Sequence, residues 1–277
     1  IAGRQITGTQ IGASAGGAID NSFRSVWATT AEDETITIQC QNVGTFNADV
    51  DWGDGSAVET ITTYNGFSHE YDDIGEHTIS ITGVFPNIYI ANGTEKTKIK
   101  KVLNLGTVGW TNLSSAFYGC SNLIEFTAGS TDTSGVSGMA TAFRDCSGLT
   151  SIDVSSFDTS SVTNMFGAFR GCSGLTSMDV SSFNTANVSR MDTLFFLCSG
   201  LTSIVGVEDW DITGLNSTGD LTNFLGGGKM TTAQYDALLV NWEAQASGIP
   251  AMTPSFGASE YTGGGAAATA HASLTDV

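Results

Sequence analysis

The sequence is poor in charge, and above all in positive charge. Charged residues make up 14% of its 277 residues, against roughly a quarter in a typical soluble protein. The 10 Lys and Arg residues are outnumbered by 28 Asp and Glu residues, which gives a formal net charge of −18. Nucleic acids and anionic membranes both attract basic surfaces. We therefore expect neither as a partner.

Long apolar runs are missing too. No stretch approaches the roughly 20 apolar residues of a membrane span, so we expect no membrane insertion. No signal peptide or lipid-attachment cysteine opens the chain, but it begins at Ile1 rather than Met, from which we expect processing upstream. Ser, Thr, Asn and Gly replace the missing charge. This composition favours an extracellular location, on a virion or on a bacterial cell surface.

The cysteines follow a repeat. Short C-x₂₋₄-C pairs, which zinc sites use, are absent. Four of the five cysteines instead recur with a constant 26-residue period, and each follows a phenylalanine at the same short distance. We predict that these pairs form a structural core, with the cysteines as small buried apolar side chains and not as disulfides or ligands. The residues are Phe117, Phe143, Phe169 and Phe195 with Cys120, Cys146, Cys172 and Cys198.

The apolar residues within one repeat are spaced like one face of a helix. Val162, Met165, Phe169 and Cys172 stand at offsets 0, 3, 7 and 10. The Ser-Gly pair that follows predicts a turn, and the next apolar residues predict a short strand. One such unit cannot bury its apolar side alone, so the copies must stack. We predict a leucine-rich-repeat-like helix/strand solenoid over residues 105–225.

The repeated unit resembles a known family. It reads Val-x-x-Met-x-x-x-Phe-x-x-Cys-Ser-Gly-Leu-Thr-Ser-Ile-Asp-Val-Ser-Ser-Phe-Asp-Thr from Val136 to Thr159, and it recurs closely from Val162 to Thr185. This unit resembles the BspA-type leucine-rich surface repeat. Members of that family are bacterial surface proteins, and similar repeats occur in phage appendages. The resemblance implies adhesion or display, not a reaction.

Residues 23–104 have the short alternating runs typical of a β-sandwich. Trp52-Gly-Asp-Gly55, His69-x-Tyr71, Gly75 and the strand at 78–82 resemble the polycystic-kidney-disease (PKD) type of immunoglobulin-like domain, which implies a spacer in an extracellular protein. The whole chain is then α+β, a PKD-like sandwich followed by the solenoid.

Two groups of residues in the sandwich could hold a metal. Asp49, Asp51 and Asp54 could bind calcium, but we favour Asp54 as a cap of its own turn. His69 and His77 have no cysteine or acidic partner at ligand spacing, so we expect structural roles. We therefore predict no metal site and no cofactor.

The remaining segments extend these two regions. Lys96, Lys98, Lys100 and Lys101 alternate in part, which is typical of a lysine-protected sheet edge or a solvated face. Residues 1–22 are rich in Gly and Ala and suggest an extended attachment arm. Residues 226–277 are predicted to be a helical cap, with helices at 232 to about 246 and at 266–274. Thr231 and Gln234 form a capping-box pattern at the start of the first helix.

Exposed positions of the repeat form ladders that could bind a ligand. An extended ligand, such as a host glycan or a surface protein, would find evenly spaced hydrogen-bonding groups there. We also expect partners among the other subunits of a virion or surface assembly, and an oligomer. The candidate ladders pair Arg144 with Arg170, Asp153 with Asp179, and Asp158 with Asn184.

Catalysis is the alternative for the same carboxylates. A glycan-cleaving tailspike would use Asp153 and Asp179, with Asp158 nearby. Glycoside hydrolysis needs two carboxyl groups in different environments, whereas a repeat puts like groups in like environments. No G-x-S-x-G motif or Ser-His-Asp order is present. We predict no catalytic residues and a binding or structural protein: a phage fibre or decoration protein, or alternatively a bacterial adhesin.

Overall fold

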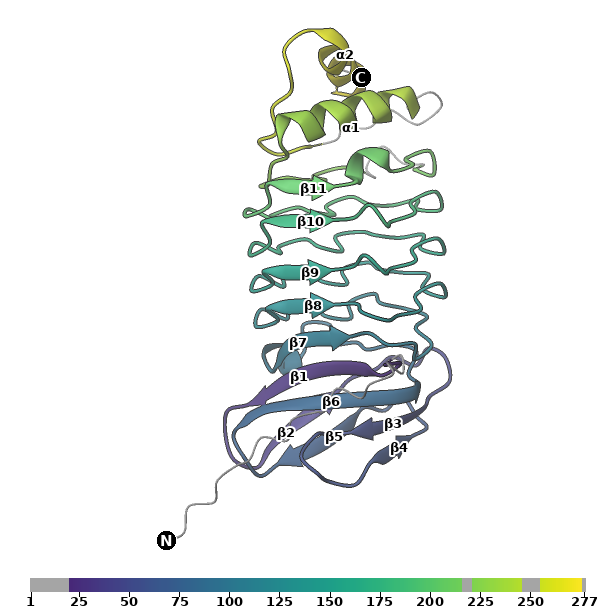
Figure 1. Cartoon of the computed structure of the whole chain (residues 1–277), viewed down its shortest axis with the longest axis vertical. Helices are drawn as coiled ribbons and strands as arrows, with labels where there is room; N and C mark the ends of the chain where they lie inside the picture. The colour runs from purple at the N-terminus through teal and green to yellow at the C-terminus, as the bar shows by residue number, and fades with distance from the viewer. Residues whose placement is uncertain (1–19, 216–220, 246–254, 276–277) are drawn as a thin grey trace, which may run out of the picture.

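The computed structural model describes residues 20–215, 221–245 and 255–275. Its architecture is mixed α+β, mostly strands, with two α-helices in the described ranges. Strand layers lie at the N-terminal end, stacked turns of chain follow, and the helices lie at the far end (Figure 1). The predicted attachment arm, residues 1–22, falls almost wholly outside the described residues.

Six strands build the N-terminal region. Four of them form antiparallel pairs in the order β4-β3-β6-β1, and the other two pair with each other in a second, two-stranded sheet. Buried and exposed residues alternate along β3, as the two-residue period of a strand requires. The bounds are β1 Phe23–Thr29, β2 Glu34–Ile38, β3 Asn47–Asp51, β4 Glu59–Ile61, β5 Phe67–Tyr71 and β6 Gly75–Val84.

One sheet runs from this region into the repeats. Strand β7 (Ile99–Asn104) pairs antiparallel with β1 and parallel with β8 (Glu125–Thr127), which in turn pairs with β9 (Ser151–Asp153). The sheet and the buried core therefore continue across residue 104, where the sequence suggested a domain boundary.

The lysine-protected edge is a wrong prediction, because β7 lies inside the sheet. The lysines around it make ion pairs and hydrogen bonds instead. Lys98 lies 3.2 Å from both Glu34 and Glu95, and Lys101 lies 3.3 Å from Glu125. Glu95 belongs to the short 3-10 helix η1 (Thr94–Thr97) and is itself buried. The basic run thus makes ion pairs with β2, η1 and β8, the elements around β7.

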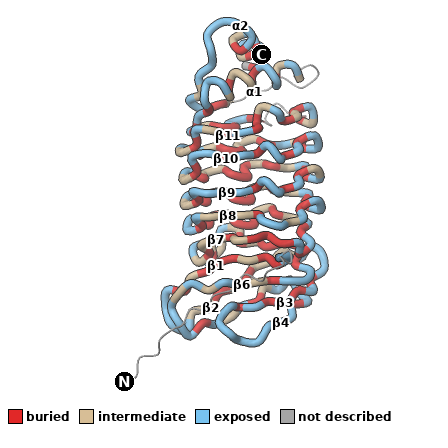
Figure 2. Tube along the Cα trace, viewed as in Figure 1, coloured by how far each residue is buried: buried red, intermediate tan, exposed pale blue. Residues whose placement is uncertain are grey.

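Each repeat of the sequence forms one turn of a stack (Figure 1). The turns pair through short parallel strands whose register joins equivalent positions of successive repeats. Between β10 (Ser177–Asp179) and β11 (Ser203–Val205), for example, Ser177 faces Ser203. Buried residues line the inside of the turns and exposed residues the outside (Figure 2).

The segment before each cysteine is not a helix, which corrects the prediction of a helix/strand unit. Thr141 and Asp145 have positive φ values of 56° and 58°, which an α-helix does not allow. Backbone N–H groups alternate in direction. The N–H of Ala142 bonds within its own turn, to Met139 O at 3.1 Å, but the N–H of Phe143 bonds to the next turn, at Ala168 O, 2.7 Å away. In an α-helix, both N–H groups would bond to carbonyl groups of the same segment.

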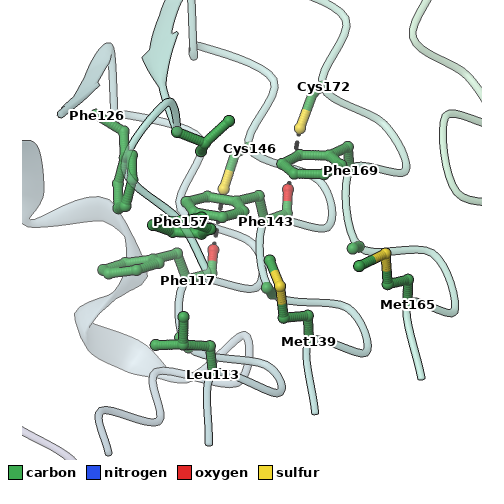
Figure 3. Packing of buried hydrophobic residues seen from close by; sticks show 14 of the residues in the cluster. Leu113, Phe117, Phe126, Met139, Phe143, Cys146, Phe157, Met165, Phe169 and Cys172 are labelled. Atoms are coloured by element: carbon green, nitrogen blue, oxygen red, sulfur yellow. Dashed lines mark hydrogen bonds between the residues drawn. The ribbon is translucent and has the colours of Figure 1, made fainter. Parts of the chain in front are cut away.

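Phenylalanine and cysteine columns fill the stack (Figure 3). The rings of Phe117, Phe143, Phe169 and Phe195 stack at centroid distances of 5.4, 5.4 and 5.6 Å. All eight predicted core residues are buried, and the four cysteines are free thiols. Each later thiol donates a hydrogen bond to a phenylalanine carbonyl in the preceding turn, as from Cys172 Sγ to Phe143 O at 3.1 Å.

Two helices lie at the end of the stack, where the sequence placed them. Helix α1 (Thr232–Gln245) follows the short 3-10 helix η2 (Val207–Asp209), and α2 (Gly265–Thr275) packs on α1 (Figure 1). The Thr231 hydroxyl accepts the N–H of Gln234 at 3.3 Å, which caps α1. Trp242 of α1 packs edge-on against Phe224, with ring centroids 5.5 Å apart.

Candidate functional site

The carboxylates of Asp153 and Asp179 stabilise tight turns of the backbone within their own repeats. Each accepts two hydrogen bonds from the serine two residues later. The bonds from the backbone N–H are 3.0 Å long in both turns, and those from the hydroxyls of Ser155 and Ser181 are 2.7 and 2.6 Å. The bonds from Ser181 lower the pKa of Asp179. A glycosidase requires the opposite shift for its acid.

The second candidate pair has the same structural role. Asp158 Oδ1 accepts the N–H of Ser160 at 2.9 Å, and Asn184 Oδ1 accepts the N–H of Ala186 at 3.1 Å. Hydrogen bonds from the Ser160 hydroxyl and backbone N–H lower the pKa of Asp158. Both side chains therefore stabilise the tight backbone turn that begins at their own residue.

Buried threonines next to this pair link the turns, and the sequence reasoning missed them. Thr159 is 1% exposed. Its hydroxyl donates to Asn184 O at 2.9 Å and accepts the N–H of Asn184 at 2.8 Å. Thr133 and Thr185 repeat the donated bond one turn before and after. The signal was present as a threonine that follows Asp or Asn in three successive repeats.

Arg144 and Arg170 lie in a column with two aromatic residues. Residues 118, 144, 170 and 196 occupy the same position in four successive turns. The Arg144 guanidinium lies 5.0 Å from the ring centre of Tyr118, and that of Arg170 lies 4.9 Å from the ring centre of Phe196. Cation–π contacts of this kind stabilise by about 0.5–1 kcal/mol at exposed sites.

A third arginine borders this column. The Arg190 guanidinium lies 4.1 Å above the Phe166 ring and 2.6 Å from the Asp192 carboxylate. Asn164 and Arg190 form a backbone bridge between adjacent turns, and each precedes a residue of the column, Arg170 or Phe196, by six positions. These three arginines are the only basic residues between 102 and 228.

The positive charges of Arg144 and Arg170 are not fully neutralised by acidic side chains. Arg144 lies 3.4 Å from Asp145. Among the described residues, Arg170 has no acidic partner, and its buried Nε has no hydrogen-bond acceptor. No hydrogen bond or ion pair within the described ranges joins Arg144 or Arg170 to Asp153 or Asp179. The predicted ladders are therefore two separate sets: structural carboxylates and an arginine column.

The three aspartates of the N-terminal region have separate partners. Asp49 accepts the Thr60 hydroxyl at 2.7 Å, and Asp51 accepts the N–H of Gly53 at 2.9 Å. Asp54 accepts the N–H of Ser56 at 2.9 Å, as a cap of its turn. In the part of the chain that the structure describes, no group of three or more His, Cys, Asp or Glu residues is placed to hold a metal ion.

His69 has an acidic partner, contrary to the sequence prediction. Its Nε2 lies 2.6 Å from Asp54 Oδ2, and its ring stacks on Trp52 with centroids 5.1 Å apart. Burial opposes ionisation of Asp54, but the hydrogen bonds from Ser56 and the contact with His69 outweigh it and lower the pKa of Asp54 to about 2. Tyr71 donates its hydroxyl to Trp52 O at 2.8 Å. These contacts lock the turn after β3.

Two surface hollows lie away from all of these carboxylates. One, of about 360 Å³, lies between β11 and the start of α1 and includes Lys229 and Glu260. The other, of about 430 Å³, lies beside β2 and is lined by Tyr64 and Tyr89. Asp153, Asp158 and Asp179 line neither hollow, so neither brings a carboxylate pair to a groove.

The geometry defines a mixed α+β protein built largely from one repeated turn. Residues 111–227 match the model of a family described as a Mycoplasma protein of unknown function, DUF285. The similarity covers the stacked turns and excludes β1–β7 and both helices. No curated protein and no solved structure matched the chain. No helix in the described ranges is long and apolar enough to cross a bilayer.

Proposed function

We propose that this chain is a non-enzymatic surface protein for adhesion, recognition or structural display, most simply a fibre or decoration protein of a phage virion. The observation that carries the proposal is the repeated turn. Its repeated phenylalanine, cysteine, methionine and leucine side chains are buried inside the stack. Equivalent outer positions therefore recur at the spacing of the turns, as a regular surface for an extended partner.

The proposal includes a finer account of the fold. Residues 105–225 form a solenoid of the BspA type, and residues 23–104 form a PKD-like β-sandwich that serves as a spacer. Hydrogen bonds between equivalent positions of successive turns support the first part. The contacts of Asp54 with His69 and of Tyr71 with Trp52 support the second, because they join the motif residues of the resemblance. The solenoid departs from a helix/strand form in its non-helical segments.

The alternatives differ in location and in chemistry. A bacterial cell-surface adhesin would use the same solenoid from a cell instead of a particle. A glycan-cleaving tailspike has less support, because Asp153, Asp158 and Asp179 each cap a turn. The glycine-rich residues 1–22 favour attachment to a larger assembly, and hence the virion.

A binding assay on intact cells tests the proposal. The full chain, fluorescently labelled, is incubated with candidate host bacteria, and bound protein and released reducing ends are both measured. We expect saturable binding with no release of sugar. Release of reducing ends would establish the tailspike instead. Proteomics of purified phage particles and of cell envelopes then separates the two locations, and light scattering tests the expected oligomer.

A further inference from the structure

We propose that the surface hollow beside β2 binds a neutral sugar unit of a surface glycan. The site, called here the tyrosine hollow, has a volume of about 430 Å³, which lies within the roughly 300–1,000 Å³ typical of small-molecule sites. The inference rests on the proposed function: it names a class of receptor and adds a binding role to the region proposed as a spacer. The side chains that line the hollow are Thr37, Gln39, Cys40, Tyr64, Asn65 and Tyr89.

The two tyrosines of the hollow have no ring partner within the described ranges. Tyr64 is 39% exposed and Tyr89 is half-buried, and neither ring packs against another aromatic ring or an arginine there. Each other tyrosine of the chain makes such a contact: Tyr71, Tyr118, Tyr235 and Tyr261. An open ring of this kind buries apolar area when the C–H face of a sugar packs on it.

The polar side chains of the hollow are available to a ligand. Among the described residues, no hydrogen bond or ion pair is made by the side chains of Gln39, Tyr64, Asn65 and Tyr89. Carboxamide and phenol groups both donate and accept hydrogen bonds, and so do the hydroxyl groups of a sugar. Proline-rich peptides also dock in aromatic-lined grooves, but proline has no N–H to donate. The lining therefore fits a sugar better than a proline-rich peptide.

The electrostatics of the hollow select a neutral sugar over an acidic one. No charged side chain lines it in the part of the chain that the structure describes. Burial raises the pKa of the Cys40 thiol to about 12, so this group is uncharged at neutral pH. An acidic sugar would find no cation in the hollow and would be repelled by the net charge of −18. A neutral sugar meets neither obstacle.

Backbone hydrogen bonds hold the segments that surround the hollow. The N–H of Tyr89 donates to Gln39 O at 2.8 Å, and the N–H of Gly66 donates to Tyr64 O at 2.7 Å. The φ of Gly66 is 70°, which glycine adopts without steric cost. Strands β2 and β5 pair antiparallel, and this pairing brings the end of β2 beside the loop that precedes β5. A site fixed in this way loses little conformational freedom when a ligand binds.

Saturation-transfer-difference NMR on the full chain tests the site, with methyl glycosides of glucose, galactose, mannose and N-acetylglucosamine as probes at millimolar concentration. We expect at least one of them to bind and glucuronate not to bind. Tyr64→Ala should weaken the binding by at least about tenfold. The matched control Tyr261→Ala removes a tyrosine that is 37% exposed in the C-terminal region, and it should change the affinity by less than about twofold. Tyr64→Phe keeps the ring but loses the hydroxyl, and should fall between them.

Several results would overturn the inference. They are an absence of binding by every glycoside, an equal loss in Tyr261→Ala, binding of glucuronate as tight as that of the neutral sugars, or binding of an oligoproline peptide in their place, which would indicate a peptide partner. Thermal melts check that Tyr64→Ala folds, and Asn65→Ala, at an exposed position, replaces it if it does not. Saturable binding to cells without binding of any glycoside would refute this site and leave the proposed function standing.

Discussion

The N-terminal strands and the stacked turns pair their buried backbone groups in different ways. In the first region, the separation in sequence differs from one pair of strands to the next and each pairing occurs once, as where Phe23 of β1 faces Ile81 of β6. In the stack, each pairing repeats at the next turn with the same separation in sequence. The N–H of Phe143 bonds to Ala168 O, and that of Phe169 bonds to Leu194 O. The first region therefore depends on unique contacts, and the second on columns of like residues.

This difference determines where a single substitution should act. A change in a column removes contacts with the turns on both sides of it, because each turn contacts only its neighbours. A change in a unique contact of the first region, such as that of His69 with Asp54, affects one turn of chain. Substitutions in the two regions should thus differ in size and in their dependence on pH.

The largest effect is expected from Phe169→Ala. The ring is fully buried and stacks on both Phe143 and Phe195. Its loss should lower the free energy of unfolding by about 3–5 kcal/mol in urea denaturation. The control is Ser181→Ala, on the exposed side of the stack, which loses its hydroxyl bond to Asp179 but keeps the backbone N–H bond, and it should cost no more than about 1.5 kcal/mol. Similar losses in the two variants would mean that inside and outside are wrongly assigned.

A smaller effect is expected from Thr159→Val, which keeps the shape of a buried side chain but removes its hydroxyl. The N–H and C=O of Asn184 both lose a partner, which should cost about 1–3 kcal/mol in the same measurement. Thr163 donates a longer bond of 3.3 Å at an exposed position. Thr163→Val should leave the free energy of unfolding nearly unchanged. A loss equal to that of Thr159→Val would rule out a special role for the buried threonines.

The smallest effect should depend on pH and be confined to the first region. The pKa of Asp54, about 2, lies below its ordinary value of 3.8. A lowered pKa stabilises the folded state above pH 4, and the stabilisation is lost as the pH falls from about 4 to 2. After allowance for solvent screening it amounts to about 1 kcal/mol. Thermal melts of the unsubstituted chain and Asp54→Asn should therefore differ at pH 6 and converge near pH 2. A constant difference would contradict this explanation.

Periodicity predicted the parts of the molecule that repeat. The constant spacing of the repeat was enough to identify the Phe169 and Cys172 columns and the stacking of turns. The amphipathic pattern around Trp242 was enough to place α1. These predictions depend on which side of the chain a residue faces, and spacing alone determines that.

The backbone conformation of the repeat could not be predicted from residue spacing. Offsets of 0, 3, 7 and 10 fit a helix, but they also fit a chain with left-handed residues at Thr141 and Asp145. The available signal was glycine at the matching positions of the next turn, Gly167 and Gly171. The pair of His69 and Asp54 joins two separate segments of the chain, and no local pattern contains that information.

The aromatic neighbours of the arginines were missed for a simpler reason. Arg144 and Arg170 were compared only with each other, although Tyr118 and Phe196 stand at the same interval on either side of them. Following one position through all turns, and not only through the turns where the residue type agrees, would have predicted the contacts.

The placement of β7 bears on how the chain acquires its structure. The strand is bonded to β1 on one side and to β8 on the other, so the N-terminal region offers a finished edge on which the first turn can form. Each turn then becomes the template for the one after it, and the costly first step of building an array without a partner is avoided. Growth from that seed would be directional and would end where α1 closes the last turn. The N-terminal region would thus act as a nucleus during folding.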